Sequence, residues 1–443
     1  MPTQSPADLA DRIAERLQEA RSRTLALLAP VGEDDLRRQH DPLMSPILWD
    51  LGHIVHFEAL WLTRNLDGAI EFTEMPGLYN PFEHPRATRA ALPLPSLDGL
   101  LALSADVRHN VLAKLQQADF ESGNPLLRDG FVYHMVLQHE YQHDETILQT
   151  LQLKHGAPYR APRSLPGAAR STEQSDGGID AFRHMVRVPA GTYPIGTSDA
   201  PDAYDNERPG HAVQLDAFEI DAAPVTNEAY LAFMNDGGYT RRELWSDAGW
   251  AWLQDARVAE PKHWHRDGDV WMTRSMDRMA PVALDHPVVH VCYHEADAFA
   301  RWAGKRLPTE YEWEVAASWN PATRTAQRYP WGDEPPTREL ANVDQLTFDT
   351  TPVGSHPRNI SPLGCYGMIG DVWEWTSSDF HGYPGFRAFP YAEYSEVFFG
   401  PEYKVLRGGS WATRSGAIRN TFRNWDFPIR RQIFSGFRCA RDV

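Results

Sequence analysis

Two histidines spaced four residues apart could bind one metal ion together. His139 and His143 lie within the run at 131–153, whose apolar residues recur at helical spacing and which contains no proline or glycine. On a helix, residues four apart are separated by about 40° around the axis and roughly 6 Å along it. Both imidazoles would then face the same side and could chelate a divalent metal. An ordinary pair of surface or core histidines would show the same spacing.

A third ligand is needed, because a metal centre that binds substrate usually has about three protein ligands and open positions. His53 is the first candidate, since it lies among apolar residues in LWDLGHIVHFE, where an unpaired imidazole would be costly. His56, three residues later, competes with it, and spacing alone does not separate the two. A core histidine bonded to a neighbour is the alternative interpretation of His53.

Four helices are expected to position these histidines. The pattern of apolar residues predicts helices over 5–29, 46–66, 96–118 and 131–153. Ser45 and Pro46 suit the cap and the first position of the second helix. The stretch at 67–95 connects the second and third helices, and such a long connection is typical of a functional loop or a crossover. A four-helix bundle with one long crossover often holds a metal in its core.

A change of composition near residue 155 divides the chain. Residues 155–180 are rich in proline, glycine, serine and alanine, so we place a linker at 155–183, between domains at 1–154 and 184–443. The second domain shows short strands, turns and few helices, with a strand predicted in PVVHVCY, a helix at about 294–303 and another capped by Thr309. It has no GxGxxG after a strand, no P-loop and no GxSxG, so nucleotide-binding and serine-hydrolase functions have no support.

The composition limits the class of protein. A chain of 443 residues favours two or three domains. The formal net charge of −17 and the lack of a basic run argue against binding to nucleic acid or anionic membranes. No signal-peptide core or membrane-spanning run is found, and the scattered cysteines Cys292, Cys365 and Cys439 are expected to be reduced and mostly buried. We therefore expect a soluble cytoplasmic protein.

Ordered motifs across the second half resemble a known family. They are PAGTYPIGT, RLPTEYEWEVAA, YPWGDE, GMIGDVWEWTSS, VLRGGSWA and SGFRCARD, and they span about residues 185–443. They are similar to the formylglycine-generating-enzyme (sulfatase-modifying-factor) family, which implies a C-type-lectin-like fold with little regular structure. Those enzymes work through a cysteine pair just after the RGGS motif. Here RGGSWATRSGAIRN has no cysteine, which argues against sulfatase modification.

The first half adds a second resemblance. DLGHIVHFE and QHEYQHDET are similar to elements of DinB-like four-helix bundles that hold a metal with three histidines. In this order the two halves resemble the ergothioneine-biosynthesis sulfoxide synthases over nearly the whole chain. The resemblance implies an α+β protein and a mononuclear non-haem Fe(II) enzyme that uses O2 to join a thiol to imidazole C2 of hercynine (N-α-trimethylhistidine). The thiol would be γ-glutamylcysteine or cysteine. A Ca²⁺ ion in the C-terminal domain is a further implication, without assigned ligands.

The resemblance also assigns residue roles. The iron ligands would be His53, His139 and His143. Gln142 would hydrogen-bond the hercynine imidazole, Asn424 would bind near the hercynine carboxylate, and Trp425 would offer its ring to the trimethylammonium group. Asp426 would contact the amino group of the thiol donor. An exposed amide is the structural alternative for Gln142, and core packing is the alternative for Trp425.

Two arginines and two tyrosines complete the assigned site. Arg86 and Arg89, in HPRATR, would bind the carboxylates of γ-glutamylcysteine, with loop salt bridges as the alternative. Tyr391 would deliver a proton or a hydrogen atom to the oxygen being reduced, which favours sulfoxide formation over thiol dioxygenation, and Tyr394 would be the second active-site tyrosine. After DLGHI, Val55-His56 departs from the family pattern, which usually has a small polar residue there, and His56 either affects donor choice or simply packs.

Several alternative functions stay open on the sequence. Selenoneine synthases share this two-domain architecture and use a selenosugar in place of the thiol, and 5-histidylcysteine sulfoxide synthases are a further possibility of the same chemistry. From another class, a non-catalytic, metal-stabilised, lectin-like binding module fits both folds. Three histidines would also suit zinc, which in general binds such sites more tightly than Fe(II).

Overall fold

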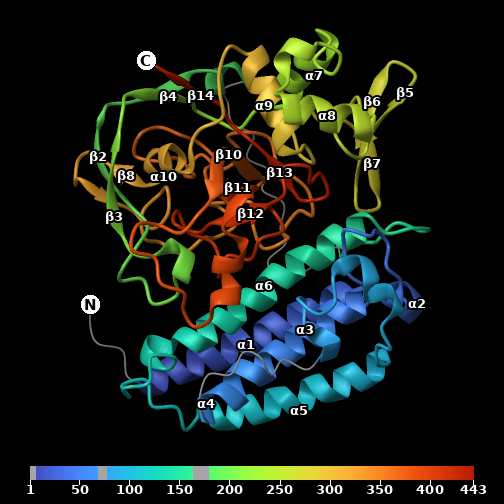
Figure 1. Ribbon diagram of the computed structural model, residues 1–443, viewed down its shortest axis with the longest axis vertical. Coiled ribbons are helices and arrows are strands. Elements are labelled where there is room, and N and C mark those ends of the chain that lie inside the picture. The colour runs from blue at the N-terminus through green and yellow to red at the C-terminus, as the bar shows by residue number, and fades with distance from the viewer. Residues whose placement is uncertain (1–5, 68–76, 163–178) are drawn as a thin grey trace. The chain divides into compact units, whose positions relative to one another are not determined.

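In the computed structural model, the chain separates into two units (Figure 1). The structure describes residues 6–67, 77–162 and 179–443. The first unit comprises Met1–Pro162 with Asp199–Asp202, and the second comprises Arg163–Ser198 with Ala203–Val443. The first is helical, and the second combines sheets with helices, which confirms the predicted α+β class. None of the described helices is long and apolar enough to cross a membrane.

The first unit is a bundle in which four long helices lie side by side, as predicted (Figure 1). These helices are α1 (Pro6–Leu28), α3 (Ile47–Ala59), α5 (Leu97–Leu115) and α6 (Phe131–Gln152). Shorter helical segments are α2 (Glu33–Arg37), a π-helical turn (Leu60–Arg64), α4 (Asn65–Asp67) and 3-10 turns at Gly77–Tyr79, Arg86–Ala91 and Arg128–Gly130. Helix α3 is buried on nearly every side, which explains its almost continuous apolar sequence.

Buried charges connect the helices of the bundle. Arg21 of α1 donates to Glu58 of α3 at 2.8 Å and to Glu140 of α6 at 2.8 Å. Arg108 of α5 donates to the same Glu58 at 2.6 Å, and the Thr24 hydroxyl donates to Glu140 at 2.7 Å. Buried charges are tolerated when they are paired and hydrogen-bonded. Loss of one partner leaves the other as an unpaired charge in an apolar environment. The cluster therefore favours one arrangement of α1, α3, α5 and α6.

The predicted cap of the second helix is wrong. The residue before α3 is Pro46, and no side chain caps the helix. The Ser45 hydroxyl instead accepts a hydrogen bond from Nη1 of Arg89 at 2.6 Å. Arg89, in the long connection at 67–95, therefore binds the hydroxyl that the local pattern assigns to the cap of the helix.

The strand predicted in PVVHVCY is also wrong. This stretch forms only an isolated bridge between Thr226 and Pro287. Its backbone groups bond to two separate segments, because the Val288 N–H donates to the Val225 carbonyl, in the loop after β4, and the Val291 N–H donates to the Ser435 carbonyl, at the start of a short later strand. A run of β-branched residues is thus buried without joining one continuous ladder.

The second unit contains five small sheets in the described part of the chain. Their strand orders are β12-β11-β10-β13, β1-β4-β14, β5-β6-β7, β2-β3 and β8-β9. The first strands are β1 (Met185–Val188), β2 (Gly191–Ile195), β3 (His211–Leu215), β4 (Phe218–Asp221), β5 (Trp264–Asp267), β6 (Val270–Ser275) and β7 (Arg278–Pro281). The later strands are β8 (Trp319–Asn320), β9 (Thr325–Ala326), β10 (Trp373–Phe380), β11 (Gly400–Arg407), β12 (Asn424–Asp426), β13 (Ser435–Gly436) and β14 (Ala440–Asp442). The helices are α7 (Asn227–Asn235), α8 (Asp247–Ala256), α9 (Tyr293–Trp302) and α10 (Glu310–Ser318).

The motifs of the second half meet in its core. Thr309 caps α10 as predicted, and Glu312 completes the capping box by accepting from the Thr309 N–H at 2.8 Å. The buried Trp313 of α10 donates its indole N–H to Glu374 of β10 at 2.8 Å, and Arg438 donates to the same carboxylate at 2.6 Å. RLPTEYEWEVAA, GDVWEWT and SGFRCARD are therefore joined by one buried network. The three cysteines, Cys292, Cys365 and Cys439, are free and buried, as expected.

Candidate metal centre

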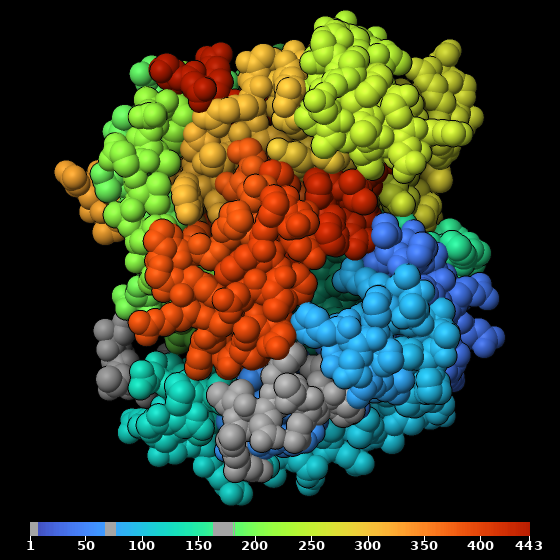
Figure 2. All heavy atoms as spheres, in the orientation of Figure 1, coloured from blue at the N-terminus to red at the C-terminus, as the bar shows by residue number. Residues whose placement is uncertain are grey.

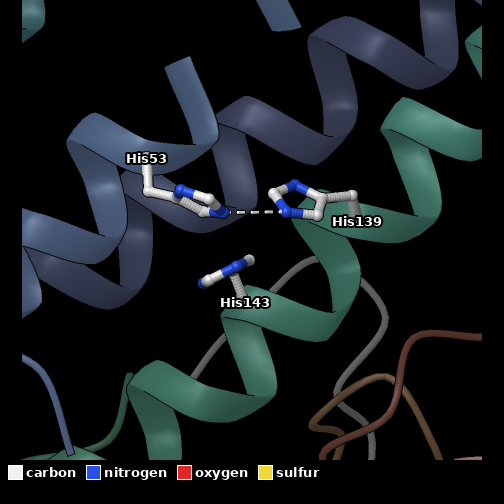
Figure 3. A group of neighbouring side chains, drawn as sticks. All are labelled: His53, His139 and His143. Carbon is white, nitrogen blue, oxygen red and sulfur yellow. Dashed lines mark hydrogen bonds between the residues drawn. The ribbon is translucent and has the colours of Figure 1, made fainter. Parts of the chain in front are cut away.

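Three histidines from two helices converge inside the bundle. His53 comes from α3, and His139 and His143 come from successive turns of α6 (Figure 3). One ring nitrogen of each lies within 4.8 Å of those of the other two. His56 is not part of this group, since its ring lies against Tyr79, with ring centres 4.6 Å apart. The structure thus selects His53 as the third member, which spacing alone left open.

The ring nitrogens are arranged as metal ligands would be. Nδ1 of His53 lies 2.9 Å from the Tyr79 carbonyl oxygen, and a carbonyl can only accept, so this nitrogen carries the proton. Nε2 of the neutral ring then has its lone pair free, and it lies 3.1 Å from Nε2 of His139. Two nitrogens bound at about 2.1 Å to one ion at a right angle would be about 3 Å apart. The observed spacing fits ligands of one metal.

Aromatic packing holds two of the imidazoles. The His53 ring stacks on Trp49 with ring centres 4.9 Å apart, and the His139 ring stacks on Phe57 at 3.7 Å. Burial lowers the pKa of His53 and of His139 well below the usual value, and the neighbouring His143 acts in the same direction. Both rings are therefore neutral at physiological pH, which is the state that binds metal.

A buried carboxylate that the sequence patterns did not indicate lies beside the third imidazole. Oδ1 of Asp50 lies 3.3 Å from Nδ1 of His143, and Asp50 is 1% exposed. Metal-binding histidines commonly have a carboxylate or carbonyl at the second ring nitrogen, which fixes the ring and raises its basicity. A signal was present, because Asp50 lies one helical turn before His53 in an otherwise apolar run.

The glycine of DLGHI also has a structural reason. A Cβ atom on Gly52 would lie 2.2 Å from the Tyr79 ring. Only glycine lets Tyr79 approach α3 so closely, and the carbonyl of Tyr79 is the group that orients His53. Gly52 therefore supports the metal centre through Tyr79.

These observations together describe a site that fits a divalent metal. Among the residues that the structure describes, His53, His139 and His143 are the one group of three or more His, Cys, Asp or Glu side chains arranged to hold an ion. Calcium can also be bound by backbone carbonyls, so the calcium ion of the C-terminal domain stays a prediction. Gln142 lies next to His143 on α6 and is partly buried.

The two predicted donor-binding arginines have different environments. Arg89 is 5% exposed, its guanidinium lies 3.5 Å from the centre of the Trp49 ring, and it donates to Ser45 and to the His84 carbonyl. No carboxylate of the described residues lies within ion-pair distance of Arg89, and burial lowers its pKa to about 10. Arg86 is more accessible and donates to the Leu43 carbonyl at 3.2 Å. The alternative of loop salt bridges does not hold for Arg89.

The last three residues of the predicted substrate motif FRNWD form strand β12 in the second unit. Strand alternation places Asn424 and Asp426 on one face and Trp425 on the other. Trp425 stacks on Phe380 with ring centres 4.0 Å apart, so one face of the indole is packed. Asp426 pairs with Arg430 at 3.2 Å. All three residues of β12 are partly exposed.

The two predicted tyrosines lie together in the segment between β10 and β11. Their ring centres are 5.9 Å apart in an edge-to-face arrangement, and both side chains are partly buried. Tyr394 also packs on Tyr204, with ring centres 4.6 Å apart. Burial raises the pKa of Tyr391 and of Tyr394 well above 10, with nearby Asp205 and Tyr204 adding to it respectively. Both are protonated phenols at neutral pH, able to donate a proton.

Fold and site define a two-part protein, with a three-histidine centre in a helical bundle followed by an irregular β-rich unit. The DinB superfamily matches residues 16–147, and the sulfatase-modifying factor enzyme 1-like domain matches residues 173–443. The chain is 45% identical over 439 residues to the hercynine oxygenase of Mycolicibacterium thermoresistibile, covering 97% of this chain and 95% of that one. It is 44% identical over 437 residues to the hercynine oxygenase of Mycobacterium tuberculosis, covering 98% and 99%.

Similarity to a formylglycine-generating enzyme is more limited. The enzyme of Thermomonospora curvata is 34% identical over 299 residues, which cover 58% of this chain and 93% of that one. The chain belongs to the hercynine oxygenase family, the ergothioneine-biosynthesis sulfoxide synthases that the motifs predicted. It is an enzyme of the oxidoreductase class.

Proposed function

We propose that the protein is an Fe(II)- and O2-dependent sulfoxide synthase that joins γ-glutamylcysteine or cysteine to imidazole C2 of hercynine. The observation that carries the proposal is the group of three histidines, two of them buried and held neutral, in a chain similar to hercynine oxygenases over almost its whole length. The three free, buried cysteines fit a cytoplasmic location, which is part of the proposal.

The proposed reaction balances without a further reductant. The C2–H bond of hercynine and the S–H bond of the thiol break, and a C–S bond forms. One oxygen atom of O2 becomes the sulfoxide oxygen, and the other leaves as water with the two hydrogens. Iron bound at the three histidines would supply the activation of O2, and such a site leaves positions open for substrates.

The chain's own residues would bind the substrates and move the proton. Trp425 would bind the trimethylammonium group through a cation–π contact worth about 0.5–2 kcal/mol. Asn424 and Gln142 would orient hercynine at its carboxylate and its imidazole. Asp426 would bind the amino group of the donor. Tyr391, a protonated phenol, would hold a proton for the oxygen being reduced, with Tyr394 as its neighbour.

Arg89 supports a donor that carries carboxylates. A buried guanidinium without an anionic partner is costly, and the cost falls when a carboxylate binds. Arg89 is held by Trp49, Ser45 and a backbone carbonyl, which fix its plane before any ligand arrives. This pre-organisation suits bidentate binding of a carboxylate, with Arg86 as the second cation. γ-Glutamylcysteine has two carboxylates and cysteine has one, so the arginine pair favours the former.

The proposal is tested by anaerobic reconstitution with Fe(II), followed by addition of O2, hercynine and one donor at a time. The donors are γ-glutamylcysteine, cysteine and a selenosugar, and mass spectrometry identifies the products. A hercynyl sulfoxide is expected with a thiol, and His139→Ala should abolish both Fe(II) loading and turnover. A selenium adduct without sulfoxide would move the protein to selenoneine synthesis. Absence of any O2-dependent product would leave a metal-bearing binding protein, and full activity of His139→Ala would refute the metal centre.

A further inference from the structure

A buried polar turn lies beneath the segment that carries the two tyrosines. Asp205, Asn206 and Glu207 form a single 3-10 turn, and they are 3%, 0% and 0% exposed. Three consecutive buried polar side chains need partners, because burial of unpaired polar groups is costly. Their partners lie about 190 to 210 residues away in the sequence.

The Asp205 carboxylate accepts hydrogen bonds from residues on both sides of Tyr391 and Tyr394. Its Oδ1 accepts from the Ser395 hydroxyl at 2.6 Å, and its Oδ2 accepts from the Phe389 backbone N–H at 3.2 Å. Nδ2 of Asn206 donates to the same Ser395 hydroxyl at 3.0 Å. Tyr391 lies between these two anchor points. The carboxylate therefore limits where the intervening backbone can go.

This segment needs such an anchor. Between β10 and β11 it contains only two short 3-10 turns, Ala392–Tyr394 and Glu396–Phe398. Glu396 and Val397 are exposed, and Figure 2 shows the orange stretch that includes this segment on the visible surface of the second unit. A surface segment without strand pairing has few contacts of its own to hold a side chain in place.

The same turn also binds the stretch that leads into β12, the strand of the predicted substrate motif. Glu207 accepts from Arg419 at 2.8 Å and from the Thr421 hydroxyl at 2.6 Å. Arg423 donates to the Asn206 carbonyl at 2.6 Å. The turn thus connects the tyrosine segment to residues that directly precede Asn424.

We propose that Asp205 is a positioning residue, whose carboxylate anchors the segment at 389–395 so that Tyr391 is held for proton delivery. The inference rests on the proposed function. Loss of the anchor would move the tyrosine and shift the reaction from C–S bond formation, which needs that proton, toward simple thiol oxygenation. In the second reaction both atoms of O2 enter the thiol, which becomes a sulfinic acid, so it too balances without a further reductant. Burial raises the pKa of Asp205 to about 6, so at pH 7.5 it is the ionised acceptor that both contacts need.

The test compares wild type with Asp205→Asn, which keeps the shape of the side chain but has only one acceptor oxygen. Glu396→Gln is the matched control, since it removes an exposed carboxylate from the same segment. Tyr391→Phe is the reference for loss of the proton. In Asp205→Asn, hydrogen exchange of the amides at 389–395 should accelerate about tenfold, as expected when one buried hydrogen bond is lost. Exchange in α3 and α6 and the affinity for Fe(II) should stay as in wild type.

Product analysis tests the consequence. Asp205→Asn should raise the ratio of sulfinic acid to sulfoxide in the direction of Tyr391→Phe, while Glu396→Gln should match wild type. Unchanged exchange would overturn the anchoring. A loosened segment with an unchanged product ratio would overturn its influence on the reaction. If wild type gave no O2-dependent product, the proposed function would fail, and the exchange data would still decide whether Asp205 anchors the segment.

Discussion

Asp50 offers a sharp test of the candidate metal centre, because its carboxylate lies beside Nδ1 of His143. It would act on the imidazole ring and would not itself be a ligand of the ion. Substitution Asp50→Asn preserves the shape of the side chain and removes its charge. A carboxylate at the second nitrogen of a ligating imidazole stabilises the positive charge that the metal places on the ring. Oδ1 of Asp50 lies 3.3 Å from Nδ1 of His143, and the residue is 1% exposed, so water screens this interaction little.

The expected effect is a loss of metal affinity of about 10- to 100-fold, the range typical for such outer partners. This corresponds to roughly 1.4–2.7 kcal/mol. The assay is an anaerobic titration of Fe(II) or Co(II) into the apo protein against a competing colorimetric chelator. The Co(II) absorption spectrum should also change, because the ring orientation of His143 is less restricted.

The control is Asp35→Asn. Asp35 lies in α2 of the same unit and pairs with Lys154 at 2.6 Å on a more accessible part of the surface. Its loss removes a carboxylate without touching the histidines, so affinity should stay as in wild type. Oδ2 of Asp50 is buried without a hydrogen-bond partner among the described residues, so the apo Asp50→Asn protein should keep its helicity and unfolding temperature. Wild-type affinity in Asp50→Asn would refute the role given to the carboxylate.

Two further predictions concern stability. Arg21→Met removes a cationic partner of both Glu58 and Glu140. It should lower the free energy of unfolding of the bundle by about 3–5 kcal/mol, measured by urea unfolding followed by circular dichroism of the helices. A loss below about 1 kcal/mol would contradict the pairing argument. Burial raises the pKa of Asp205 from 3.8 to about 6. As pH rises, Asp205 therefore loses its proton in the unfolded chain before it does so in the native protein, and native stability is lost between about pH 4 and pH 6. Wild type should therefore lose about 2.4 kcal/mol relative to Asp205→Asn between pH 4 and pH 7, and a pH-independent difference in urea unfolding would contradict this prediction.

The three histidines of the candidate metal centre could be predicted from local sequence because their signal is local. His139 and His143 follow from helical geometry, since a four-residue spacing on one uninterrupted helix brings two side chains to one face. His53 could be proposed from its apolar surroundings, but its choice over His56 depends on how α3 packs against α6. That packing is set by contacts among helices that are far apart in the sequence, such as the pair Arg21–Glu140.

The groups that orient the ligands could not be predicted in the same way. The Tyr79 carbonyl reaches His53 across 26 residues, through a connection with no regular pattern. Ser45 shows the opposite failure, because its local signal for a helix cap is strong and a tertiary contact from Arg89 overrides it. Asp205 and Ser395 are 190 residues apart, and neither has a sequence context that marks it as a partner of the other.

Charge pairing separates the scaffold of this protein from its site. Two buried cations that hold the fold have carboxylate partners: Arg21 pairs with two glutamates in the bundle, and Arg407 pairs with Glu314 in the second unit. Arg89 and Asp205 are buried as well, yet no described side chain of opposite charge lies within ion-pair distance of either. Burial lowers the pKa of Arg89 and raises the pKa of Asp205, and both shifts favour the neutral form of the side chain. Such groups lower stability and persist where function needs them. An anionic ligand should therefore stabilise the protein through Arg89, whereas no ligand charge is needed at Asp205, because its two hydrogen bonds already hold the tyrosine segment.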